Sequence, residues 1–212
     1  MFDLDGTLLP LPSSETRFFA HMLRKGLVGP RQLARSGWAF LAALVASDPH
    51  GTARYKDYLA DLDVETTCRE AERFASETLF ALLRPDMINR LNSHRAAGDH
   101  VVLLTGAPDF LADTLGWHLN VDAVCATQCR TANGRYLAAP PLNHPYRERK
   151  LLIAEQLAVQ QKTTLAETTA YGDSRHDIAL LSAVGHPVAV EPDRKLRQRA
   201  NVDGWEIVTS AA

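Results

Sequence analysis

From about residue 85 to its end, the sequence alternates short apolar segments with segments of helical periodicity, and this alternation restricts the fold most. Strands are predicted at 100–105 (HVVLLT), 121–126, 168–173 (TTAYGD), 187–192 (PVAVEP) and 205–208 (WEIV). Helices are predicted at 85–98, 108–119 and 148–160, and from residues 175 and 193 onward. Strands separated by helices form parallel sheets that helices cover on both faces. We therefore predict an α/β fold with a Rossmann-like, doubly wound parallel sheet.

The first predicted strand is separated from the next by an unusually long segment. Residues 2–5 read as the end of a short strand that turns at Gly6, and the N-terminus looks clipped because such a strand ordinarily begins a few residues earlier. About ninety residues follow before the next strand, although a crossover needs only a dozen or more. Residues 13–84 read as helices only, so we predict an inserted helical cap there and a core at 1–12 and 85–212.

Composition excludes several classes of protein. The chain has 23 basic and 25 acidic residues and a formal net charge of -2, so no basic stripe for nucleic acid is expected. The longest apolar run, 38–46 (WAFLAALVA), is too short to span a bilayer and reads as a buried helix. The three cysteines are too few for a disulfide framework, and no secretory signal is recognisable. A cytoplasmic protein with reduced thiols is expected.

Acidic residues lie at the ends of two of the predicted strands. Asp3 and Asp5 point to the same side of the first strand, and charges about 4 Å apart repel by roughly 4 kcal/mol at an effective dielectric near 20. Asp173 follows a later strand, with Asp177 at the start of the next helix. Lys150 is the expected balancing charge, although Arg147 and Arg149 compete with it. A cluster of this kind suits Mg²⁺ and a phosphate.

A third element is formed by Thr105 and Gly106, which end the strand after the inserted segment. A hydroxyl and a backbone amide at a strand-to-helix turn are donors for a phosphate oxygen, and the N-terminus of the next helix adds to this effect. Alone, this pattern is common. Its position between the two acidic strand ends makes a phosphate site the preferred interpretation.

Four parts of the sequence resemble, in this order, the four motifs of the haloacid dehalogenase-like superfamily of phosphohydrolases. They are Asp3-Leu4-Asp5-Gly6-Thr7, Thr105, Lys150 and the segment from Gly172 to Asp177. The helical insertion and the 188–200 segment (VAVEPDRKLRQRA) are similar to its phosphoserine-phosphatase-like branch. The resemblance covers the core from end to end. The cap matches only in position and helical character.

The resemblance implies a two-step phosphoryl transfer with Asp3 as the nucleophile and Asp5 as the acid and then the base. It implies that Mg²⁺ is held by the Asp3 carboxylate, the Asp5 backbone carbonyl and Asp173. Thr105, Gly106 and Lys150 would bind the phosphate, and Asp177 would orient Lys150 or a metal-bound water. The implied enzyme is a Mg²⁺-dependent phosphomonoester hydrolase for a small metabolite, with the cap reading the leaving group.

The chain also departs from the pattern. Phosphoserine phosphatases of the branch tend to have Ser where Gly6 stands and Ser-Gly-Gly at 105–107, which weakens phosphoserine as the substrate. Glu15 begins the cap roughly where the branch places an acid that reads a substrate amino group, and His176 is a further candidate for substrate contact. Histidinol phosphate and other phosphomonoesters stay open, as does the oligomeric state. Two alternatives remain: a phosphotransferase or mutase that uses the same aspartyl phosphate, and a catalytically idle module that binds a phosphorylated ligand.

Overall fold

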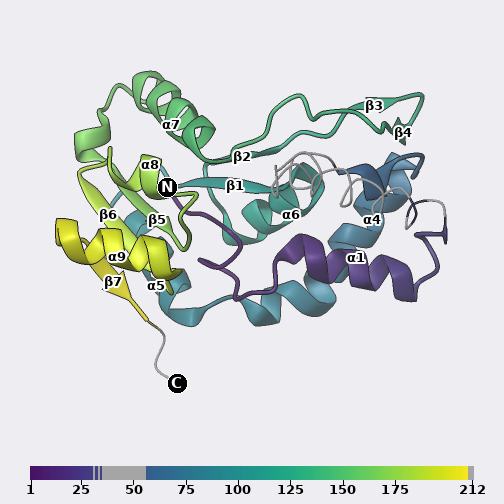
Figure 1. Ribbon diagram of the computed structural model, residues 1–212, viewed down its shortest axis with the longest axis horizontal. Helices are drawn as coiled ribbons and strands as arrows, with labels where there is room; N and C mark the ends of the chain where they lie inside the picture. Colours follow the sequence, from purple (N-terminus) through teal and green to yellow (C-terminus); the bar gives the residue numbers. More distant parts are fainter. Residues whose placement is uncertain (31, 33, 35–55, 210–212) are drawn as a thin grey trace.

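The computed structural model describes residues 1–30, 32, 34 and 56–209 (Figure 1). The apolar run at 38–46, predicted to be a buried helix, lies outside the described residues. No helix in the described ranges combines the length and the apolar character needed to cross a bilayer.

A parallel sheet forms the core. β1 (Val102–Pro108) pairs with β2 (Ala123–Thr127), and β6 (His186–Val190) pairs with both β5 (Thr169–Gly172) and β7 (Glu206–Val208). The N-terminal segment joins the two halves: the Phe2 N–H donates to the Val102 carbonyl (2.8 Å), and the Asp3 N–H donates to the Tyr171 carbonyl (3.0 Å). The spatial order is therefore β2, β1, residues 1–3, β5, β6 and β7, all parallel. The predicted doubly wound core is confirmed.

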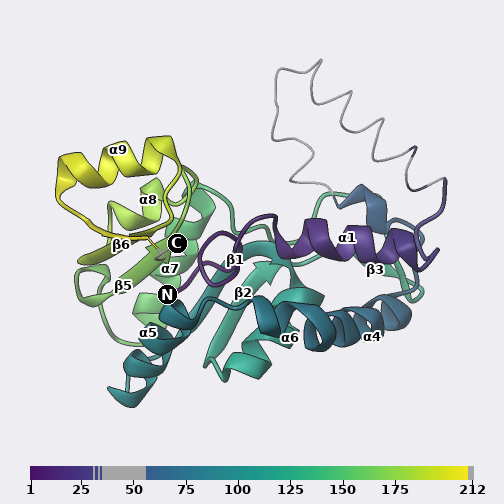
Figure 2. The ribbon, with the colours of Figure 1, turned by 90° about the horizontal axis from the view of Figure 1, so that it is seen from below.

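Helices cover the sheet on both faces (Figure 2). One face carries α5 (Pro85–Ala96) and α6 (Asp109–Leu119), and the other carries α7 (Glu148–Gln160), α8 (Ile178–Leu181) and α9 (Arg194–Asp203). Neighbouring strand residues divide between the two cores: Leu103 packs with α5 and α6, whereas Leu104 packs with α7, α8 and α9. Side chains alternate across a strand, so continuous apolar runs such as VVLL bury both faces.

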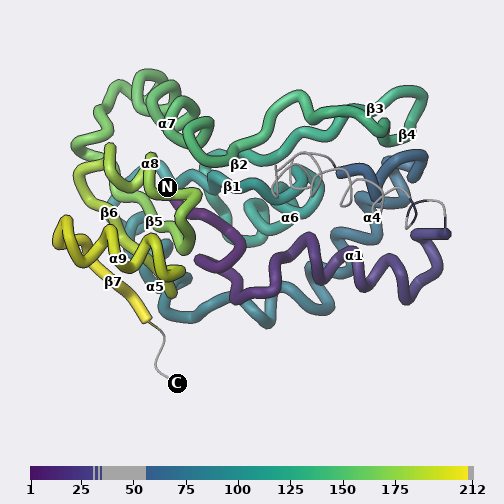
Figure 3. The backbone as a smooth tube through the Cα atoms, in the orientation of Figure 1, coloured from purple at the N-terminus to yellow at the C-terminus, as the bar shows by residue number. Residues whose placement is uncertain are grey.

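The inserted segment contributes α1 (Ser14–Arg24), the 3₁₀ helix η1 (Asp57–Leu59), α4 (Val64–Phe74), the π-helical turn η2 (Ala75–Leu79) and the 3₁₀ turn η3 (Phe80–Leu82). Ser13 and Asp63 cap α1 and α4, each accepting a backbone N–H three residues later. The backbone trace in Figure 3 places α1 and α4 at one end of the molecule, where the Phe18 and Phe74 rings lie 5.7 Å apart. Ring packing therefore joins the two helices.

The hairpin of β3 (Thr131–Ala132) and β4 (Arg135–Tyr136) extends to the same end as α4 (Figure 1). Asn133 and Gly134 have φ angles of 50° and 74°, as a type I′ turn requires. The Asp61 N–H donates to the Tyr136 carbonyl (2.9 Å), and the Val64 N–H donates to the Gly134 carbonyl (2.9 Å). The hairpin thus binds the inserted segment, although it lies in the range assigned to the core. The core and cap boundaries stay predictions.

One predicted helix begins later than expected. The helix expected from Arg175 begins only at Ile178, after the turn that holds Ser174 to Asp177. In this turn the Asp177 N–H donates to the Ser174 carbonyl (2.9 Å), and the Asp177 carboxylate accepts the Ser174 N–H and hydroxyl (both 3.2 Å). These bonds take the place of a first helical turn. The short 3₁₀ helix η4 (Leu165–Glu167) precedes β5.

Candidate active site

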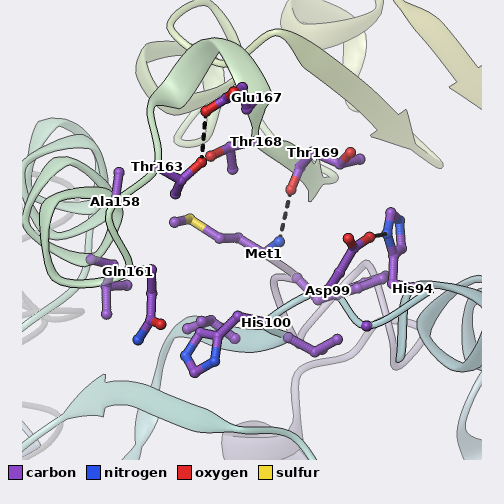
Figure 4. Close-up of a pocket in the computed structure, with 15 residues that line it drawn as sticks. Met1, His94, Asp99, His100, Ala158, Gln161, Thr163, Glu167, Thr168 and Thr169 are labelled. Atoms are coloured by element: carbon purple, nitrogen blue, oxygen red, sulfur yellow. Dashed lines mark hydrogen bonds and ion pairs between the residues drawn. The ribbon is translucent and has the colours of Figure 1, made fainter. Parts of the chain in front are cut away.

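Two cavities of similar volume lie at opposite ends of the strands. One, of about 310 Å³, is lined by the beginnings of β1 and β5 and by Met1, His94 and Glu167 (Figure 4). The other, of about 300 Å³, is lined by Asp3, Asp5, Thr105, Lys150 and Asp173. The two cavities are alike in volume, but they differ in the chemistry of the residues that line them. Open α/β sheets bind ligands at the carboxyl ends of their strands, where the second cavity lies.

Lys150 lies between the carboxylates of Asp3 and Asp177. It stands in the first turn of α7, and its Nζ lies 3.1 Å from Asp3 Oδ1 and 2.6 Å from Asp177 Oδ1. The Asp3 Oδ1 atom also accepts the Leu4 N–H (2.8 Å). Within the described residues, both contacts of the Asp3 carboxylate use Oδ1, so Oδ2 is the oxygen left to face a reactant. Lys150 is only 4% exposed, so the ammonium is buried between two carboxylates.

Asp173 completes the acidic cluster. It follows the last residue of β5, and one carboxylate oxygen each from Asp3, Asp173 and Asp177 lie within 4.8 Å of one another. Gly6 makes this packing possible, because a Cβ atom there would lie 2.1 Å from the Asp173 Oδ2 atom and the residue has a φ of +85°. A side chain at residue 6 would therefore push Asp173 out of place.

Negative charge exceeds positive charge in the acidic cluster. Burial raises the pKa of Asp3 to about 7, with Lys150 opposing the change, and burial together with the charges of Asp3 and Asp177 raises the pKa of Asp173 to about 8. Burial disfavours the charged form of Lys150, but Asp177 and Asp3 outweigh it and raise its pKa. Three crowded carboxylates around one ammonium fit a hard divalent cation with oxygen ligands, such as Mg²⁺.

We predict that pH and Mg²⁺ act together on stability. Because the pKa values of Asp3 and Asp173 are raised above about 4, the folded protein binds more protons than the unfolded chain between pH 4 and 8. This contribution to stability is lost as the pH rises through the folded pKa values. In chelator, the melting temperature should fall from pH 5.5 to pH 8. Mg²⁺ should raise it most at pH 8, because Mg²⁺ at 100 times its Kd adds about 2.7 kcal/mol to the free energy of unfolding.

Differential scanning fluorimetry at both pH values measures this effect. Asp173→Asn is the test variant because it removes a carboxylate from the cluster, whereas Asp113→Asn, at an exposed position on α6, is the matched control. The control should keep the Mg²⁺ response. A response of equal size in Asp173→Asn would contradict a metal site at this cluster.

Asp5 takes a different position from Asp3. Its carboxylate accepts the backbone N–H of Ser14 (2.6 Å) and the hydroxyl of Ser14 (3.1 Å), at the first residue of α1. Its carboxylate is not among the three oxygens that converge, so the side chain is directed toward the inserted segment. Burial raises the pKa of Asp5, although the two bonds from Ser14 oppose this change. A carboxyl group in such surroundings can hold a proton and release it.

Thr105 and Gly106 lie inside the last, irregular part of β1 rather than in a turn after it. The predicted strand ended at Thr105, whereas β1 continues to Pro108 with a break in register after Leu104. The Thr105 hydroxyl accepts the Ala107 N–H (3.1 Å), which leaves its hydrogen for another acceptor. The Gly106 carbonyl accepts the Thr127 hydroxyl (2.7 Å). This bond fixes the orientation of the peptide group between Gly106 and Ala107, which also carries the Ala107 N–H.

Several residues that line the cavity were not identified from the sequence. They are Ser13 and Lys56 from the inserted segment, and His144, Pro145 and Tyr146 from the loop before α7. No pattern marks this loop, since its residues have no regular spacing. His176, a candidate for substrate contact, lines the cavity half-buried, and its Nε2 lies 3.2 Å from the Tyr146 hydroxyl. Glu15 also lines the cavity.

Comparison with known proteins places the chain among hydrolases. The model of the haloacid dehalogenase-like hydrolase family matches residues 1–182. A histidinol-phosphatase from Neisseria meningitidis is 26% identical, with 98% of this chain and 96% of the relative covered. A Bordetella pertussis protein of unknown function has a similar crystal structure, with a TM-score of 0.83, 26% identity and coverage of 98% and 96%. A phosphoserine phosphatase, seen as an analogue of its phospho-aspartyl intermediate, shares the fold at 18% identity, with a TM-score of 0.64 and coverage of 97% and 90%.

Proposed function

The chain belongs to the haloacid dehalogenase-like hydrolase family, and we propose that it is a Mg²⁺-dependent phosphomonoester hydrolase that acts on a small metabolite through an aspartyl phosphate. The observation that carries this proposal is the convergence of Asp3, Asp173 and Asp177 around Lys150, in a cavity that Thr105 and Gly106 also line. The name of the Neisseria relative, a histidinol-phosphatase, supports the same class of substrate.

In the proposed first step, Asp3 Oδ2 attacks phosphorus, a bond forms between them and the bond from phosphorus to the leaving oxygen breaks. Asp5 gives its proton to that oxygen, so an alcohol leaves. In the second step, Asp5 takes a proton from the attacking water, and phosphate departs from Asp3. The raised pKa of Asp5 supports a role as the acid, because a buried carboxyl group holds its proton closer to neutral pH.

The remaining residues are proposed to bind the phosphate and Mg²⁺ and to orient Lys150. The Thr105 hydroxyl, the Gly106 amide and Lys150 are proposed to bind phosphate oxygens and to offset the charge that grows on them. Asp3, Asp173 and the Asp5 backbone carbonyl are proposed to hold Mg²⁺, which supplies positive charge beside the phosphate. The 2.6 Å contact between Asp177 and Lys150 supports Asp177 as the residue that orients this lysine.

The proposal includes the organisation of the chain. Residues 13–84 act as a cap that closes over the leaving group, and residues 1–12 and 85–212 act as the core that carries the chemistry. The direction of Asp5 toward Ser14 supports this division, because it puts the proposed acid at the boundary between the two parts. A cytoplasmic location and a small-molecule partner also belong to the proposal.

Turnover of a phosphomonoester panel should depend on Mg²⁺. We expect the purified chain to release phosphate from p-nitrophenyl phosphate and from a subset of phosphometabolites, to lose this activity in excess chelator and to regain it with added Mg²⁺. Phosphate release is measured with a colorimetric assay, and product analysis with added alcohols distinguishes hydrolysis from transfer to an acceptor. Undiminished rates in chelator would exclude the metal role. No turnover across the panel would favour the idle binding module.

A further inference from the structure

Thr127 joins the end of β2 to the proposed phosphate-binding segment. It is the last residue of β2 and is 0% exposed, so it does not contact a reactant itself. Its hydroxyl oxygen lies 2.7 Å from the Gly106 carbonyl oxygen and 2.7 Å from Nδ1 of His144, which lines the cavity. Thr127 therefore connects the loop before α7 to the last part of β1.

The hydrogen atoms of this group can be assigned. The Gly106 carbonyl has no hydrogen, so its contact with Thr127 uses the hydrogen of the Thr127 hydroxyl. If that hydrogen pointed to His144 instead, two oxygen atoms would lie 2.7 Å apart with only lone pairs between them. The Thr127 oxygen therefore accepts from His144, whose ring carries a proton at Nδ1. Lys56 Nζ, 3.5 Å from the same carbonyl, is a more distant second donor.

The bond to Gly106 also determines how Thr105 is oriented. The Gly106 carbonyl and the Ala107 N–H belong to one planar peptide group, so a bond that fixes the first also fixes the second. The Ala107 N–H donates to the Thr105 hydroxyl oxygen (3.1 Å), so the hydroxyl hydrogen points away from this amide. The Thr105 side chain, at the cavity, is thus oriented by contacts that begin at Thr127.

The irregular pairing of β1 explains why a side chain takes this role. β1 and β2 lie side by side (Figure 1), but their register is interrupted between Leu104, which pairs with Cys125, and Pro108, which pairs with Thr127. Residues 105–107 fall in this interruption, so a regular ladder does not orient their peptide groups. The hydroxyl of Thr127 supplies an orienting bond at this point.

We infer that Thr127 is a positioning residue for phosphate binding: its hydroxyl, held by His144, fixes the 106–107 peptide and thereby directs the Thr105 hydroxyl hydrogen toward a phosphate oxygen. The inference rests on the proposed hydrolase function, in which Thr105 offsets charge that grows on the phosphate oxygens. A donor that is turned away no longer meets this charge in the transition state. Loss of the Thr127 hydroxyl should therefore lower kcat/KM.

Thr127→Val is the main test variant. It keeps the branched shape of the side chain and removes the hydroxyl, so kcat/KM for p-nitrophenyl phosphate in saturating Mg²⁺ should fall by about tenfold or more. Thr127→Ser keeps a hydroxyl and should retain most of the wild-type rate. Thr67→Val is the matched control, because Thr67 on α4 is also buried and its hydroxyl donates to a backbone carbonyl, that of Asp63 (2.8 Å), outside the cavity lining. The control should keep kcat/KM close to wild type.

A double-mutant cycle tests whether Thr127 acts through Thr105. Thr105→Val alone should lower kcat/KM by about 10²-fold or more, because it removes a donor to the phosphate. Without the Thr105 hydroxyl, Thr127 has no donor to orient, so adding Thr127→Val to Thr105→Val should change kcat/KM by less than about twofold. Two independent effects would multiply, and that outcome overturns the inference.

The protonation of His144 tests the inference without a threonine variant. In wild-type chain labelled with ¹⁵N at histidine, a two-dimensional ¹H–¹⁵N spectrum of the imidazole rings should show a proton on His144 Nδ1. The variant His144→Gln identifies which signals belong to this residue. An Nδ1 atom without a proton means that Thr127 donates to His144 and not to Gly106. That result overturns the inference even if the Thr127 variants do not fold.

The outcomes separate this inference from the proposed function. Wild-type hydrolysis of p-nitrophenyl phosphate, with a loss in Thr127→Val no larger than the loss in Thr67→Val, overturns the inference alone. A rate in Thr127→Ser as low as that of Thr127→Val also overturns it, because the hydroxyl is then not the cause. A wild-type chain with no turnover across the phosphomonoester panel overturns the proposed function, and the inference with it.

Discussion

Asp3→Asn is expected to lower kcat for p-nitrophenyl phosphate by about 10⁴-fold or more, the scale on which loss of a covalent nucleophile is felt. An amide oxygen is a weak nucleophile and cannot form the acyl phosphate on which the proposed mechanism depends. The substitution is nearly isosteric, so the Leu4 N–H and the Lys150 ammonium still have an oxygen to contact at residue 3. The fold should therefore persist while the chemistry is lost. Steady-state rates in saturating Mg²⁺ measure the effect.

Asp113→Asn is the matched control for this variant. It makes the same change of acid to amide at an exposed position on α6 and should leave kcat unchanged. Acid quenching of the wild-type reaction, followed by mass spectrometry, should find the phosphoryl group on the peptide that contains Asp3. Rates in Asp3→Asn within tenfold of the wild type, or a phosphoryl group on another residue, would be incompatible with the proposed nucleophile.

The parallel sheet was predictable because its strands are marked locally. Runs such as VVLL at 101–104 bury alternate side chains on two faces, and this requirement leaves a continuous apolar signal in the sequence. The acidic residues were predictable for a related reason. Asp3 lies at the end of the first strand and Asp173 comes directly after β5, and parallel strands end at the same edge, so their meeting follows from topology. Their positions at strand ends were enough to predict that the two carboxylates lie close together.

The contacts from the inserted segment were not predictable in the same way. The bonds between Asp5 and Ser14, and between Lys56 and Glu15, join residues whose separation follows no period of helix or strand. They depend on how the inserted segment packs against the core, which the sequence pattern does not describe. The predicted start of α8 at Arg175 was wrong for a local reason. The side chain of Asp177 stabilises a turn that begins at Ser174, where a first helical turn was expected.

Lys150→Met should destabilise the metal-free chain more than any other single change considered. The variant keeps much of the side-chain volume but leaves Asp3 and Asp177 without the ammonium that lies 3.1 and 2.6 Å from them. Removing one partner from a buried ion pair costs roughly 3–5 kcal/mol, because an uncompensated charge stays in the interior. Chemical denaturation in chelator at pH 8 measures the loss. Lys195→Met, at an exposed position on α9, is the control and should stay close to wild type.

The pH dependence of this loss identifies its cause. Without Lys150, the carboxylates of Asp3 and Asp173 lose their charge repulsion only by binding protons, so the pKa values of these two residues should rise further. The variant should therefore lose less stability at pH 5 than at pH 8. Mg²⁺ should recover part of the loss at pH 8, because a cation beside Asp3 and Asp173 replaces some of the missing charge. Lys150→Arg should be less destabilised because it keeps the charge. A loss that is equal at both pH values and indifferent to Mg²⁺ would point to altered packing around α7 instead, and would remove Lys150 from the electrostatic balance of the site.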